Sequence, residues 1–522
     1  MSLRHHDWIA SHAIRRADAL ATVDLGNGRT LRYRDLHQRI DGIAAWLAED
    51  FGIGTADRVA VLAQGSIDVF ELQFACFRLG AIFVPLNFRL AVPELVAILA
   101  NCSPKLLVHD AAFAGLAASA SAASASAANA STSGTTPLTA TGPASSFEQA
   151  AASGRSPGSP PGHYAETTLE DVSTILYTSG TTGLPKGVMV THAMNLFNAV
   201  NLHGLAELSD RSVLLSVLPL FHTGGLNVYA NPVFHAGGTV ITMPVFDPGQ
   251  ALAALGDATL GINLLFGVPA HYQFPAQHAD FATTDLSRLA HAGVGGVPAP
   301  LSVIDAWQKR GVELTQGYGM TETGPVVLYL DKADSTRKLG SAGKPVMHVE
   351  IRLVDAEGHD VADGEVGEIW LRGPSITQGY WNNPAATAAA LEGGWLHTGD
   401  AAMRDPEGYY FIVDRWKDMY ISGGENVYPA EVENVLSRLP ALAEAAVIGV
   451  PSTRWGETGR AIVVLKPGQA MTADAILAHC AAQLARYKLP QEVVFTDALP
   501  RNATGKIHKP TLRQQFGGPA AI

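Results

Sequence analysis

The sequence has little cysteine and little charge. Among its 522 residues there are only three cysteines, Cys76, Cys102 and Cys480, and their spacing fits no metal site. We expect three buried thiols in a reducing compartment, which predicts a cytoplasmic location. Charged residues make up only 16% of the chain and apolar residues 47%, a balance that argues against disorder of the whole chain and supports packed cores.

The sequence also lacks an excess of positive charge and any long apolar run. The formal net charge is -12, which disfavours general binding to nucleic acid or to an anionic membrane, because both need a broad basic surface. No stretch approaches the roughly 20 apolar residues that span a bilayer, and the N-terminus opens no apolar signal core. We therefore expect no integral membrane segment, and any anionic ligand must be held by a local site.

Helical and strand-like segments alternate where the chain is well patterned. Apolar residues at helical spacing predict helices over residues 34–50 and 70–79, and short apolar runs predict strands over 58–63 and 81–85. This alternation indicates a layered α/β fold, and 522 residues exceed what one core usually supports. We predict a large N-terminal domain of several subdomains over residues 1–415 and a small α+β C-terminal domain over 416–522.

Residues 112–160 break this pattern. They are mostly Ala, Ser, Gly, Thr and Pro and have almost no large apolar side chain. Such a segment has too little apolar surface to offset the entropy of ordering it. The composition therefore predicts a disordered, low-complexity insertion on the surface.

A loop rich in glycine and hydroxyl side chains carries the strongest chemical signal. The run Tyr177-Thr-Ser-Gly-Thr-Thr-Gly-Leu-Pro-Lys-Gly-Val188 follows the strand-like residues 172–176. Its glycines allow backbone N–H groups to converge, its hydroxyls add donors, and Lys186 adds a positive charge, so the loop suits a polyphosphate.

Two common nucleotide motifs are excluded by their own spacing. A Walker A loop that starts at Gly180 needs glycine where Pro185 stands and Ser or Thr where Gly187 stands. The run from Gly293 to Pro298 fails the dinucleotide fingerprint, because Pro298 occupies its last glycine position. A P-loop ATPase and a dinucleotide-dependent enzyme are therefore disfavoured.

The 177–188 loop resembles the phosphate loop of the acyl-adenylate-forming superfamily, which includes acyl- and aryl-CoA synthetases, adenylation domains and luciferases. Further blocks typical of this superfamily occur in the same order. They are Gly295–Pro298, Gln316–Thr323, Trp395–Asp400, Asp414–Asp418, Ile421–Pro429 and Pro500–Lys506. The resemblance covers nearly the whole chain outside 112–160, and it is strongest to bacterial fatty-acyl-CoA synthetases. It implies ATP, Mg²⁺ and coenzyme A as cofactors or co-substrates.

The resemblance implies roles for individual residues. Tyr318 is expected to stack on adenine, Glu322 to hold magnesium against the phosphates, and Asp400, backed by Arg415, to accept from the ribose hydroxyls. The full set expected to bind the nucleotide is Thr178, Ser179, Gly180, Thr181, Thr182, Gly183, Lys186, Gly295, Gly296, Val297, Tyr318, Thr321, Asp400 and Arg415.

The small domain is expected to contribute residues to both half-reactions, adenylation and thioester formation. Lys506 is the lysine that we expect to offset the repulsion between the attacking carboxylate and the α-phosphate of ATP. The resemblance implies a second arrangement, in which the domain turns about a hinge at Lys417 and presents Gly423 and Gly424 to coenzyme A. Lys506, Glu322, Thr178 and His222 form the expected catalytic set.

The acyl pocket is expected around the block Pro219–Gly225. His222 resembles the histidine that faces the acyl carboxylate, although a core histidine bound to a backbone carbonyl fits as well. The predicted walls are Phe221, His222, Gly225, Asn227, Gly293, Val294, Met320 and Val326. They include no Lys or Arg, which disfavours a second anionic group on the substrate, and the small residues Ala292 and Gly293 indicate an open or long pocket. A medium- or long-chain fatty acid is expected, and an aryl acid is the alternative.

Two other functions remain open from the sequence. One is an adenylating enzyme that loads a carrier protein, and the other is a nucleotide-binding regulatory protein without catalysis. The presence of Lys506, Glu322 and Asp400 disfavours the second. The sequence leaves the oligomeric state open, a homodimer included.

Overall fold

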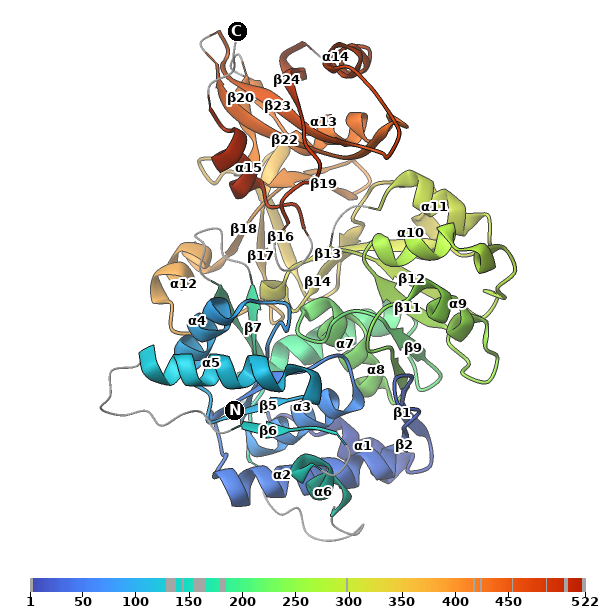
Figure 1. Cartoon of the computed structure of the whole chain (residues 1–522), viewed down its shortest axis with the longest axis vertical. Helices are drawn as coiled ribbons and strands as arrows, with labels where there is room; N and C mark the ends of the chain where they lie inside the picture. Colours follow the sequence, from blue (N-terminus) through green and yellow to red (C-terminus); the bar gives the residue numbers. More distant parts are fainter. Residues whose placement is uncertain are drawn as a thin grey trace. The chain divides into compact units, whose positions relative to one another are not determined.

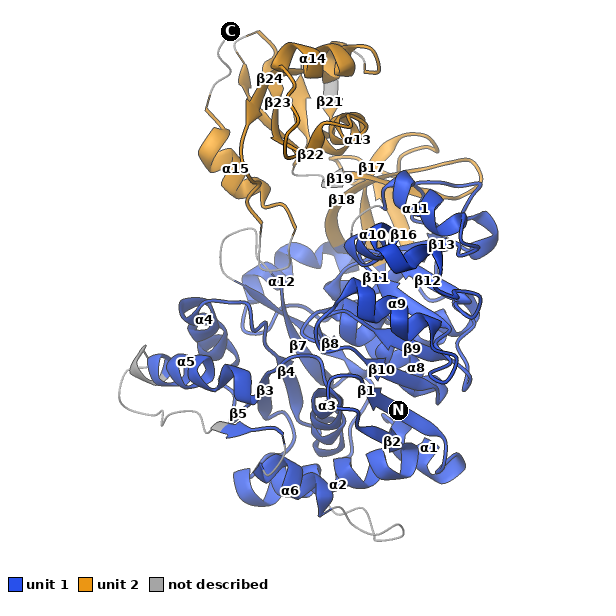
Figure 2. Ribbon diagram, turned by 45° about the vertical axis from the view of Figure 1, so that its right-hand side comes forward, with its two compact units in different colours: residues 1–350, 372–396 blue, residues 351–371, 397–522 orange. Residues whose placement is uncertain are grey.

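The computed structural model describes residues 3–127, 138–142, 145–153, 165–178, 185–296, 299–415, 418–422, 425–452, 454–484, 486–501 and 506–518. The chain forms two compact units (Figure 2). Unit 1 comprises Met1–Glu350 and Arg372–Leu396, and unit 2 comprises Ile351–Leu371 and His397–Ile522. The predicted α/β class is confirmed, because both units combine sheets with helices (Figure 1). The predicted domain boundary at residue 415 stays a prediction.

The larger sheet of unit 1 has nine strands in the order β15-β14-β13-β12-β11-β9-β10-β1-β2. The six strands from β13 to β1 run parallel, so their carboxyl ends share one edge of the sheet. The strand bounds are β1 Leu20–Asp24, β2 Thr30–Arg32, β9 Val213–Ser216, β10 Thr239–Thr242, β11 Leu264–Gly267, β12 His291–Val294, β13 Leu314–Gly319, β14 Val326–Tyr329 and β15 Lys344–Pro345. Ligands of open α/β sheets bind at this kind of edge.

A second sheet of unit 1 has six strands in the order β6-β5-β3-β4-β7-β8. Its first five strands are parallel, and β7 and β8 form an antiparallel hairpin. The bounds are β3 Arg58–Leu62, β4 Ile82–Pro85, β5 Leu106–His109, β6 Leu138–Ala140, β7 Val172–Thr178 and β8 Lys186–Thr191. The predicted strands over 58–63 and 81–85 are therefore confirmed as β3 and β4.

The two predicted N-terminal helices are also confirmed. Helix α2 spans Tyr33–Phe51, and its apolar positions Leu36, Ile40 and Leu47 are fully buried. It ends at Gly52, whose φ of 61° is the left-handed conformation that glycine adopts without strain. Helix α3 spans Ile67–Leu79 and is buried on every side. The other helices of unit 1 are α1 Trp8–Arg15, α4 Val92–Cys102, α7 His192–Leu205, α8 Ala230–Ala236, α9 Pro248–Gly256, α10 Ala270–Gln277, α11 Leu301–Gln308 and α12 Pro384–Ala390.

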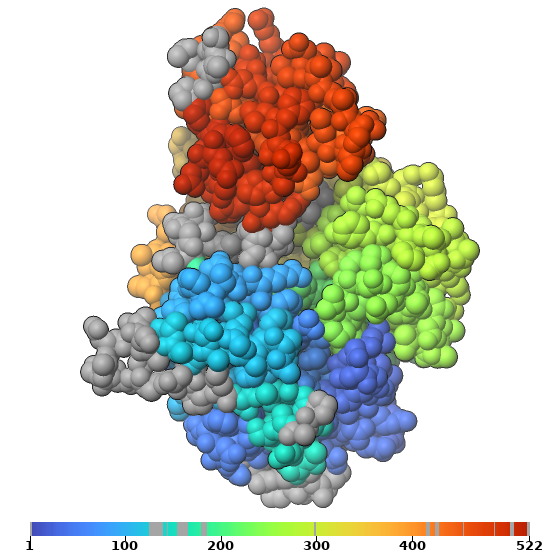
Figure 3. Space-filling view, viewed as in Figure 1, coloured from blue at the N-terminus to red at the C-terminus, as the bar shows by residue number. Residues whose placement is uncertain are grey.

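The prediction that residues 112–160 are disordered is wrong for three segments. Ala114–Ala127 forms helix α5, Leu138–Ala140 forms strand β6, and Ser146–Ala152 forms helix α6. Figure 3 shows the segment that contains α4 and α5 on the surface of unit 1, in blue to cyan. The small side chains of α5 allow close packing against α4, where Ala117 is fully buried.

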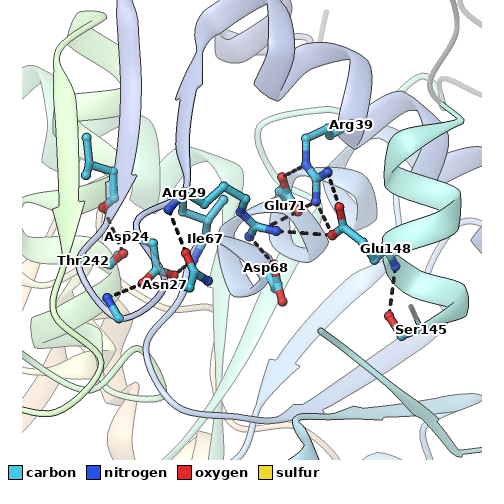
Figure 4. A network of polar contacts seen from close by, with 12 residues as sticks. Asp24, Asn27, Arg29, Arg39, Ile67, Asp68, Glu71, Ser145, Glu148 and Thr242 are labelled. Carbon is cyan, nitrogen blue, oxygen red and sulfur yellow. Dashed lines mark hydrogen bonds and ion pairs between the residues drawn. The ribbon is translucent and has the colours of Figure 1, made fainter. Parts of the chain in front are cut away.

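Helix α6 is anchored by one aromatic residue and one carboxylate. Phe147 is fully buried, and Glu148 accepts from the Arg39 guanidinium of α2 at 2.7 and 2.8 Å (Figure 4). Arg39 also binds the fully buried carboxylate of Glu71, and Arg29 contacts Glu148 at 3.3 Å. This ionic network joins α6 to α2 and α3, which composition alone does not reveal.

Unit 2 contains two sheets, and in the second of them β24 pairs with β23 in parallel. The four-stranded sheet β16-β17-β18-β19 falls mainly in this unit, with bounds Glu350–Val354, Val366–Arg372, Leu396–Arg404 and Tyr410–Arg415. The other sheet has the order β21-β20-β23-β22, with β24 paired to β23. Its strands are β20 Tyr420–Ser422, β21 Glu425–Val427, β22 Leu442–Ser452, β23 Gly456–Leu465 and β24 Pro490–Phe495, and its helices are α13 Pro429–Leu436, α14 Ala473–Ala481 and α15 Lys509–Phe516.

The structure also bears on the expected burial of the cysteines and on the expectation of no integral membrane segment. Cys76, Cys102 and Cys480 are buried free thiols, as predicted. Burial raises the pKa of each thiol, to about 11 for Cys480, so these groups stay protonated near neutral pH. Across the residues that the structure describes, every helix is too short or too polar to span a bilayer.

Candidate nucleotide and acyl site

Several predicted blocks of unit 1 end at the same edge of the nine-stranded sheet. The block that contains His222 follows β9, Gly295 and Gly296 follow β12, and Tyr318 lies at the end of β13. Because these strands are parallel, their carboxyl ends bring the three blocks to one edge. The predicted adenine and acyl residues therefore gather there.

The loop predicted to bind phosphate lies between the two strands of the β7–β8 hairpin in the sequence. Thr178 and Lys186 are paired across its ends, and the Thr178 hydroxyl donates to the Lys186 carbonyl at 3.4 Å. Gly187 follows, and a Cβ there would lie 2.8 Å from Ile175 Cγ2, so only glycine fits without a shift. Ser179, Gly180, Thr181, Thr182 and Gly183 lie outside the described residues.

Tyr380 connects Lys186 to Glu322. Its hydroxyl donates to Glu322 Oε1 at 2.9 Å, and the Lys186 ammonium lies 5.1 Å from the centroid of its ring. Glu322 is 6% exposed, so its carboxylate needs such polar partners. The predicted phosphate-binding lysine and the predicted magnesium ligand, 136 positions apart in the chain (322 − 186), therefore meet at one side chain.

Backbone hydrogen bonds hold this arrangement together. The segment Thr377–Trp381 runs beside β8, where Met189 donates to Gly379 at 3.0 Å and Trp381 donates to Gly187 at 2.7 Å. The N–H of Thr377 donates to the carbonyl of Glu322 at 2.8 Å. One segment thus bonds both to the strand that bears Lys186 and to the turn that bears Glu322.

The turn after β13 is braced by Thr323, whose side chain is fully buried. Its hydroxyl oxygen accepts from the Met320 N–H at 2.9 Å and lies within hydrogen-bond distance of the Pro325 carbonyl. Tyr318, Met320 and Thr321 on this turn are half-buried, which leaves part of each side chain accessible to a ligand.

The predicted adenine edge is described only in part. Gly295 donates to the Gly267 carbonyl at 3.2 Å, and Gly296 has a φ of 83°, which glycine tolerates. Val297 lies outside the described residues.

Unit 2 carries the predicted ribose carboxylate. Asp400 is 5% exposed on β18, and its backbone pairs with that of Arg415 on β19; their expected cooperation at the ribose stays a prediction. Glu368 on β17 supports this position, because its Oε1 accepts from the N–H of Gly399 at 2.9 Å and its Oε2 accepts from the Trp370 indole at 3.0 Å. Trp370 stacks on His397, with ring centroids 4.0 Å apart.

Unit 2 also contains the residues that are expected to act in one half-reaction or the other, and the expected hinge between the two arrangements. Lys506 is exposed and precedes α15, close to the bridge between Arg501 and Ile507. The predicted hinge Lys417 and the predicted coenzyme A contacts Gly423 and Gly424 lie outside the described residues. The roles of these four residues stay predictions.

The predicted acyl-pocket residues lie on the β9–α8 connection, on β12 and around β14 of unit 1. Phe221, Val294 and Val326 are buried, and His222 is half-buried with its ring 4.5 Å from that of Phe221. Gly225 and Asn227 belong to the π-helical turn Gly224–Val228.

Asn227 belongs to a buried chain of amide side chains. Its Oδ1 accepts from Asn231 Nδ2 at 2.8 Å, and Asn231 Oδ1 accepts from Gln73 Nε2 at 2.8 Å. The carbonyl of Asn227 accepts from Asn198 Nδ2 at 2.7 Å. These bonds tie the π-helical turn to α3 and α7.

The expectation of an open pocket beside Gly293 is wrong. A Cβ at Gly293 would lie 3.0 Å from both Phe266 Cδ2 and the Tyr229 hydroxyl, so two aromatic side chains already fill this space. The Tyr229 hydroxyl lies 3.4 Å from the Tyr329 hydroxyl, which lies 3.2 Å from Thr315 Oγ1. Burial raises the pKa of Tyr229 well above its ordinary value, so the hydroxyl stays neutral. A small cavity beside these residues is lined in part by Gly224, Gly225, Tyr229 and Phe266.

Sequence reasoning missed three residues beside the predicted ones in unit 1, Tyr380, Phe266 and Tyr229, and one in unit 2, Glu368. The run Gln378-Gly-Tyr-Trp-Asn382 contains an aromatic pair after a glycine, which is a weak signal of a functional turn. Tyr229, Phe266 and Glu368 lie in strand-like or apolar segments, where they are indistinguishable from ordinary core or edge residues.

The donor set around Glu322 fits a magnesium ion that is shared with phosphates. Among the described residues, three or more His, Cys, Asp or Glu side chains nowhere converge as a metal site would require. Mg²⁺ is commonly held by one or two carboxylates together with substrate phosphates, so the single buried carboxylate of Glu322 beside the phosphate-loop hairpin suffices.

Comparison with known proteins agrees with this geometry. The family model described as "AMP-binding enzyme" matches residues 9–381, and "AMP-binding enzyme C-terminal domain" matches residues 431–506. A feruloyl-CoA synthase of Amycolatopsis sp is 41% identical over 98% of this chain and 99% of its own length. A long-chain-fatty-acid–CoA ligase of Mycobacterium tuberculosis is 38% identical over 89% of both chains. The structure of O-succinylbenzoate coenzyme A synthetase from Bacillus subtilis, in complex with ATP and magnesium, is similar with a TM-score of 0.85 at 28% identity, over 98% of this chain and all of that one.

Proposed function

Because the chain belongs to the AMP-binding enzyme family, we propose that it is an AMP-forming acid–CoA ligase whose acid is an aryl carboxylic acid. Its co-substrates are ATP and coenzyme A, and its metal ion is Mg²⁺. In the first half-reaction a carboxylate oxygen attacks the α-phosphorus of ATP, and pyrophosphate leaves. In the second, the thiol sulfur of coenzyme A attacks the acyl carbon, and AMP leaves.

The observation that carries the ligase chemistry is the contact of Lys186 and Glu322 with Tyr380. Lys186 is proposed to bind the phosphates released as pyrophosphate, together with Thr178 and the other loop donors. Glu322 would hold Mg²⁺, which neutralises charge on the phosphates. Tyr318 would stack on adenine, and Asp400 would accept from the ribose hydroxyls.

The small unit is proposed to serve both half-reactions. Lys506 would stabilise the charge that develops on the α-phosphate, and Gly423 and Gly424 would leave room for the pantetheine arm of coenzyme A. A turn about Lys417 would exchange the two arrangements.

The aromatic wall supports the choice of acid. Phe266 and Tyr229 occupy the space that a long alkyl chain would need beside Gly293, and hydroxyls of Tyr229, Tyr329 and Thr315 form a polar end. A flat ring packs well against the faces of these two aromatic side chains. The relationship to a feruloyl-CoA synthase, whose product name indicates an aryl acid, supports the same class.

A panel of acids tests the proposal. Cinnamic, benzoic, arylacetic, hexanoic and palmitic acids are each incubated with ATP, Mg²⁺ and coenzyme A, and AMP and thioester are quantified. We expect the highest kcat/KM with an aryl acid, and higher activity with a fatty acid would overturn the substrate class. A carboxylate labelled with heavy oxygen should transfer one labelled atom to AMP, and label in orthophosphate would overturn the adenylate mechanism. Replacing coenzyme A by an acyl-carrier protein tests the carrier-loading alternative.

A further inference from the structure

Tyr380 occupies a position that the predicted chemistry leaves without a role. It is 9% exposed, its hydroxyl donates to Glu322 Oε1 at 2.9 Å, and its ring lies beneath the Lys186 ammonium at 5.1 Å. One side chain therefore contacts both the candidate metal ligand and the candidate phosphate ligand, through two different parts of its structure.

The protein holds Tyr380 rigidly. Tyr380 forms an antiparallel bridge with Val188, and its N–H donates to Thr387 Oγ1 at 2.9 Å. Gly379, just before it, has a φ of 133°, and a Cβ there would lie 2.3 Å from Thr387 Cγ2. The backbone on both sides is thus fixed by strand pairing, a side-chain hydrogen bond and a glycine, which limits where the phenol can point.

A phenol hydroxyl that donates to a carboxylate restricts the carboxylate's rotation. Glu322 reaches its site from a short turn, and the bond from the Tyr380 hydroxyl to Oε1 helps to fix the last torsion of its side chain. Carboxylates that bind metals are commonly held in this way, and loss of such a partner typically lowers metal affinity by about 10- to 100-fold. The ring, in contrast, attracts the Lys186 ammonium without involving the hydroxyl.

We propose that Tyr380 is a positioning residue with two separable actions: its hydroxyl orients the Glu322 carboxylate for Mg²⁺, and its ring places the Lys186 ammonium for the phosphates. The inference rests on the proposed function, because it takes Glu322 as the magnesium ligand and Lys186 as a phosphate ligand.

The test compares Tyr380→Phe, which removes only the hydroxyl, with Tyr380→Leu, which removes hydroxyl and ring. Binding of Mn²⁺, a paramagnetic substitute for Mg²⁺, is titrated by electron paramagnetic resonance in the presence of a non-cleavable ATP analogue. For Tyr380→Phe we expect the Mn²⁺ dissociation constant to rise about tenfold while the affinity for metal-free analogue stays unchanged. For Tyr380→Leu we expect the affinity for Mn²⁺ and the affinity for the metal-free analogue both to fall. The Mg²⁺ concentration for half-maximal AMP formation should follow the same order.

Tyr33→Phe is the matched control, because it also removes a buried hydroxyl, one that donates to the Gly238 carbonyl at 2.7 Å away from this site. It should bind Mn²⁺ as the wild type does. A double-mutant cycle that combines Tyr380→Phe with Glu322→Gln separates orientation of the Glu322 carboxylate from a general loss of stability. Once the carboxylate is gone, removal of the Tyr380 hydroxyl should change metal affinity no further.

Wild-type Mn²⁺ affinity in Tyr380→Phe, or fully additive effects in the cycle, would overturn the proposal. Failure of the proposed function looks different, since the wild type would then form no AMP, or Glu322→Gln would retain normal metal affinity. Thermal unfolding of each variant verifies that it is folded.

Discussion

The Glu368 carboxylate on β17 accepts from the Gly399 N–H on the neighbouring strand β18 at 2.9 Å, and from the indole of Trp370 on its own strand at 3.0 Å. Gly399 immediately precedes Asp400, and its φ is 68°. The side chain of one strand thus fixes the backbone that presents the proposed ribose ligand on the next.

Substitution Glu368→Gln should therefore weaken ATP binding. An amide can accept from only one of the two N–H groups, and loss of a hydrogen bond to a charged group costs about 1.5–3 kcal/mol. We expect KM for ATP to rise by about tenfold or more, with a smaller change in kcat, in steady-state assays at saturating acid and coenzyme A. Glu365→Gln is the control. Glu365 is exposed and accepts a hydrogen bond from the Ala362 N–H, so this substitution should leave KM for ATP unchanged. An unchanged KM in Glu368→Gln would contradict the positioning of Asp400.

Two substitutions at the aromatic wall should each lower kcat/KM for aryl acids relative to longer acids, one by removing the wall and one by crowding it. Phe266→Ala removes a ring that lies 3.0 Å from the position of a Gly293 Cβ, so longer acids should gain kcat/KM relative to aryl acids. Gly293→Ala places a methyl group against Phe266 and Tyr229, so it should lower kcat/KM for every aryl acid in the panel. Phe274→Ala, at a half-exposed position on α10, serves as a control for loss of a phenyl ring. An unaltered acid preference in both wall variants would place the acyl group elsewhere.

The sequence predicts local helices and strands better than contacts between distant residues. Local patterns predicted β3, β4, α2 and α3, because each depends on apolar spacing within a few residues. Lys186 and Glu322 could be proposed as site residues because their motifs are contiguous in the sequence. Tyr380 was missed because its importance arises from contacts with residues 58 positions or more away, which no local pattern encodes.

The same limitation explains the two wrong predictions. Residues 112–160 were predicted to be disordered from composition, yet Phe147 and Glu148 find their partners on α2 and α3. Gly293 was taken as a sign of open space, but a glycine also occurs where a neighbour approaches closely, and here Phe266 and Tyr229 do so.

The ionic network around α6 should contribute to stability. Glu148→Gln keeps the shape of the side chain but removes the charge that the Arg39 guanidinium binds, and this binding holds the pKa of Glu148 below its ordinary value. We expect the free energy of unfolding to fall by about 2 kcal/mol in urea titrations, since hydrogen bonds to charged groups are worth about 1.5–3 kcal/mol.

The exposed pair of Arg4 and Glu166 provides the comparison for this effect. Glu166→Gln should change stability by about 0–1 kcal/mol, as is typical of ion pairs in solvent. Equal effects of Glu148→Gln and Glu166→Gln would show that the network does not anchor α6.

Stability should decrease as the solution becomes acidic, in part because of His5. Burial lowers its pKa to about 4, although Asp7 acts in the opposite direction, and its ring stacks on His192, whose pKa burial also lowers. Between about pH 6.5 and pH 4 the unfolded chain binds a proton that folded His5 does not, so the free energy of unfolding falls as pH falls. For His5 alone the loss from pH 7.5 to pH 5 is about 2 kcal/mol.

His5→Phe keeps an aromatic ring against His192 and removes the titrating group. The difference in thermal stability between pH 7.5 and pH 5 should therefore be smaller in this variant than in the wild type. A steeper pH dependence in His5→Phe would contradict the assigned direction.

Separate measurement of the two half-reactions tests the account most directly. Lys506→Ala and Gly424→Leu are each assayed for pyrophosphate release from acid and ATP, and for thioester formation from supplied acyl-adenylate and coenzyme A, with the exposed Lys466→Ala as control. The account predicts that Lys506→Ala loses the first activity and keeps the second, that Gly424→Leu does the reverse, and that the control retains both. Equal loss of both activities in the two variants, or retention of both, would contradict it.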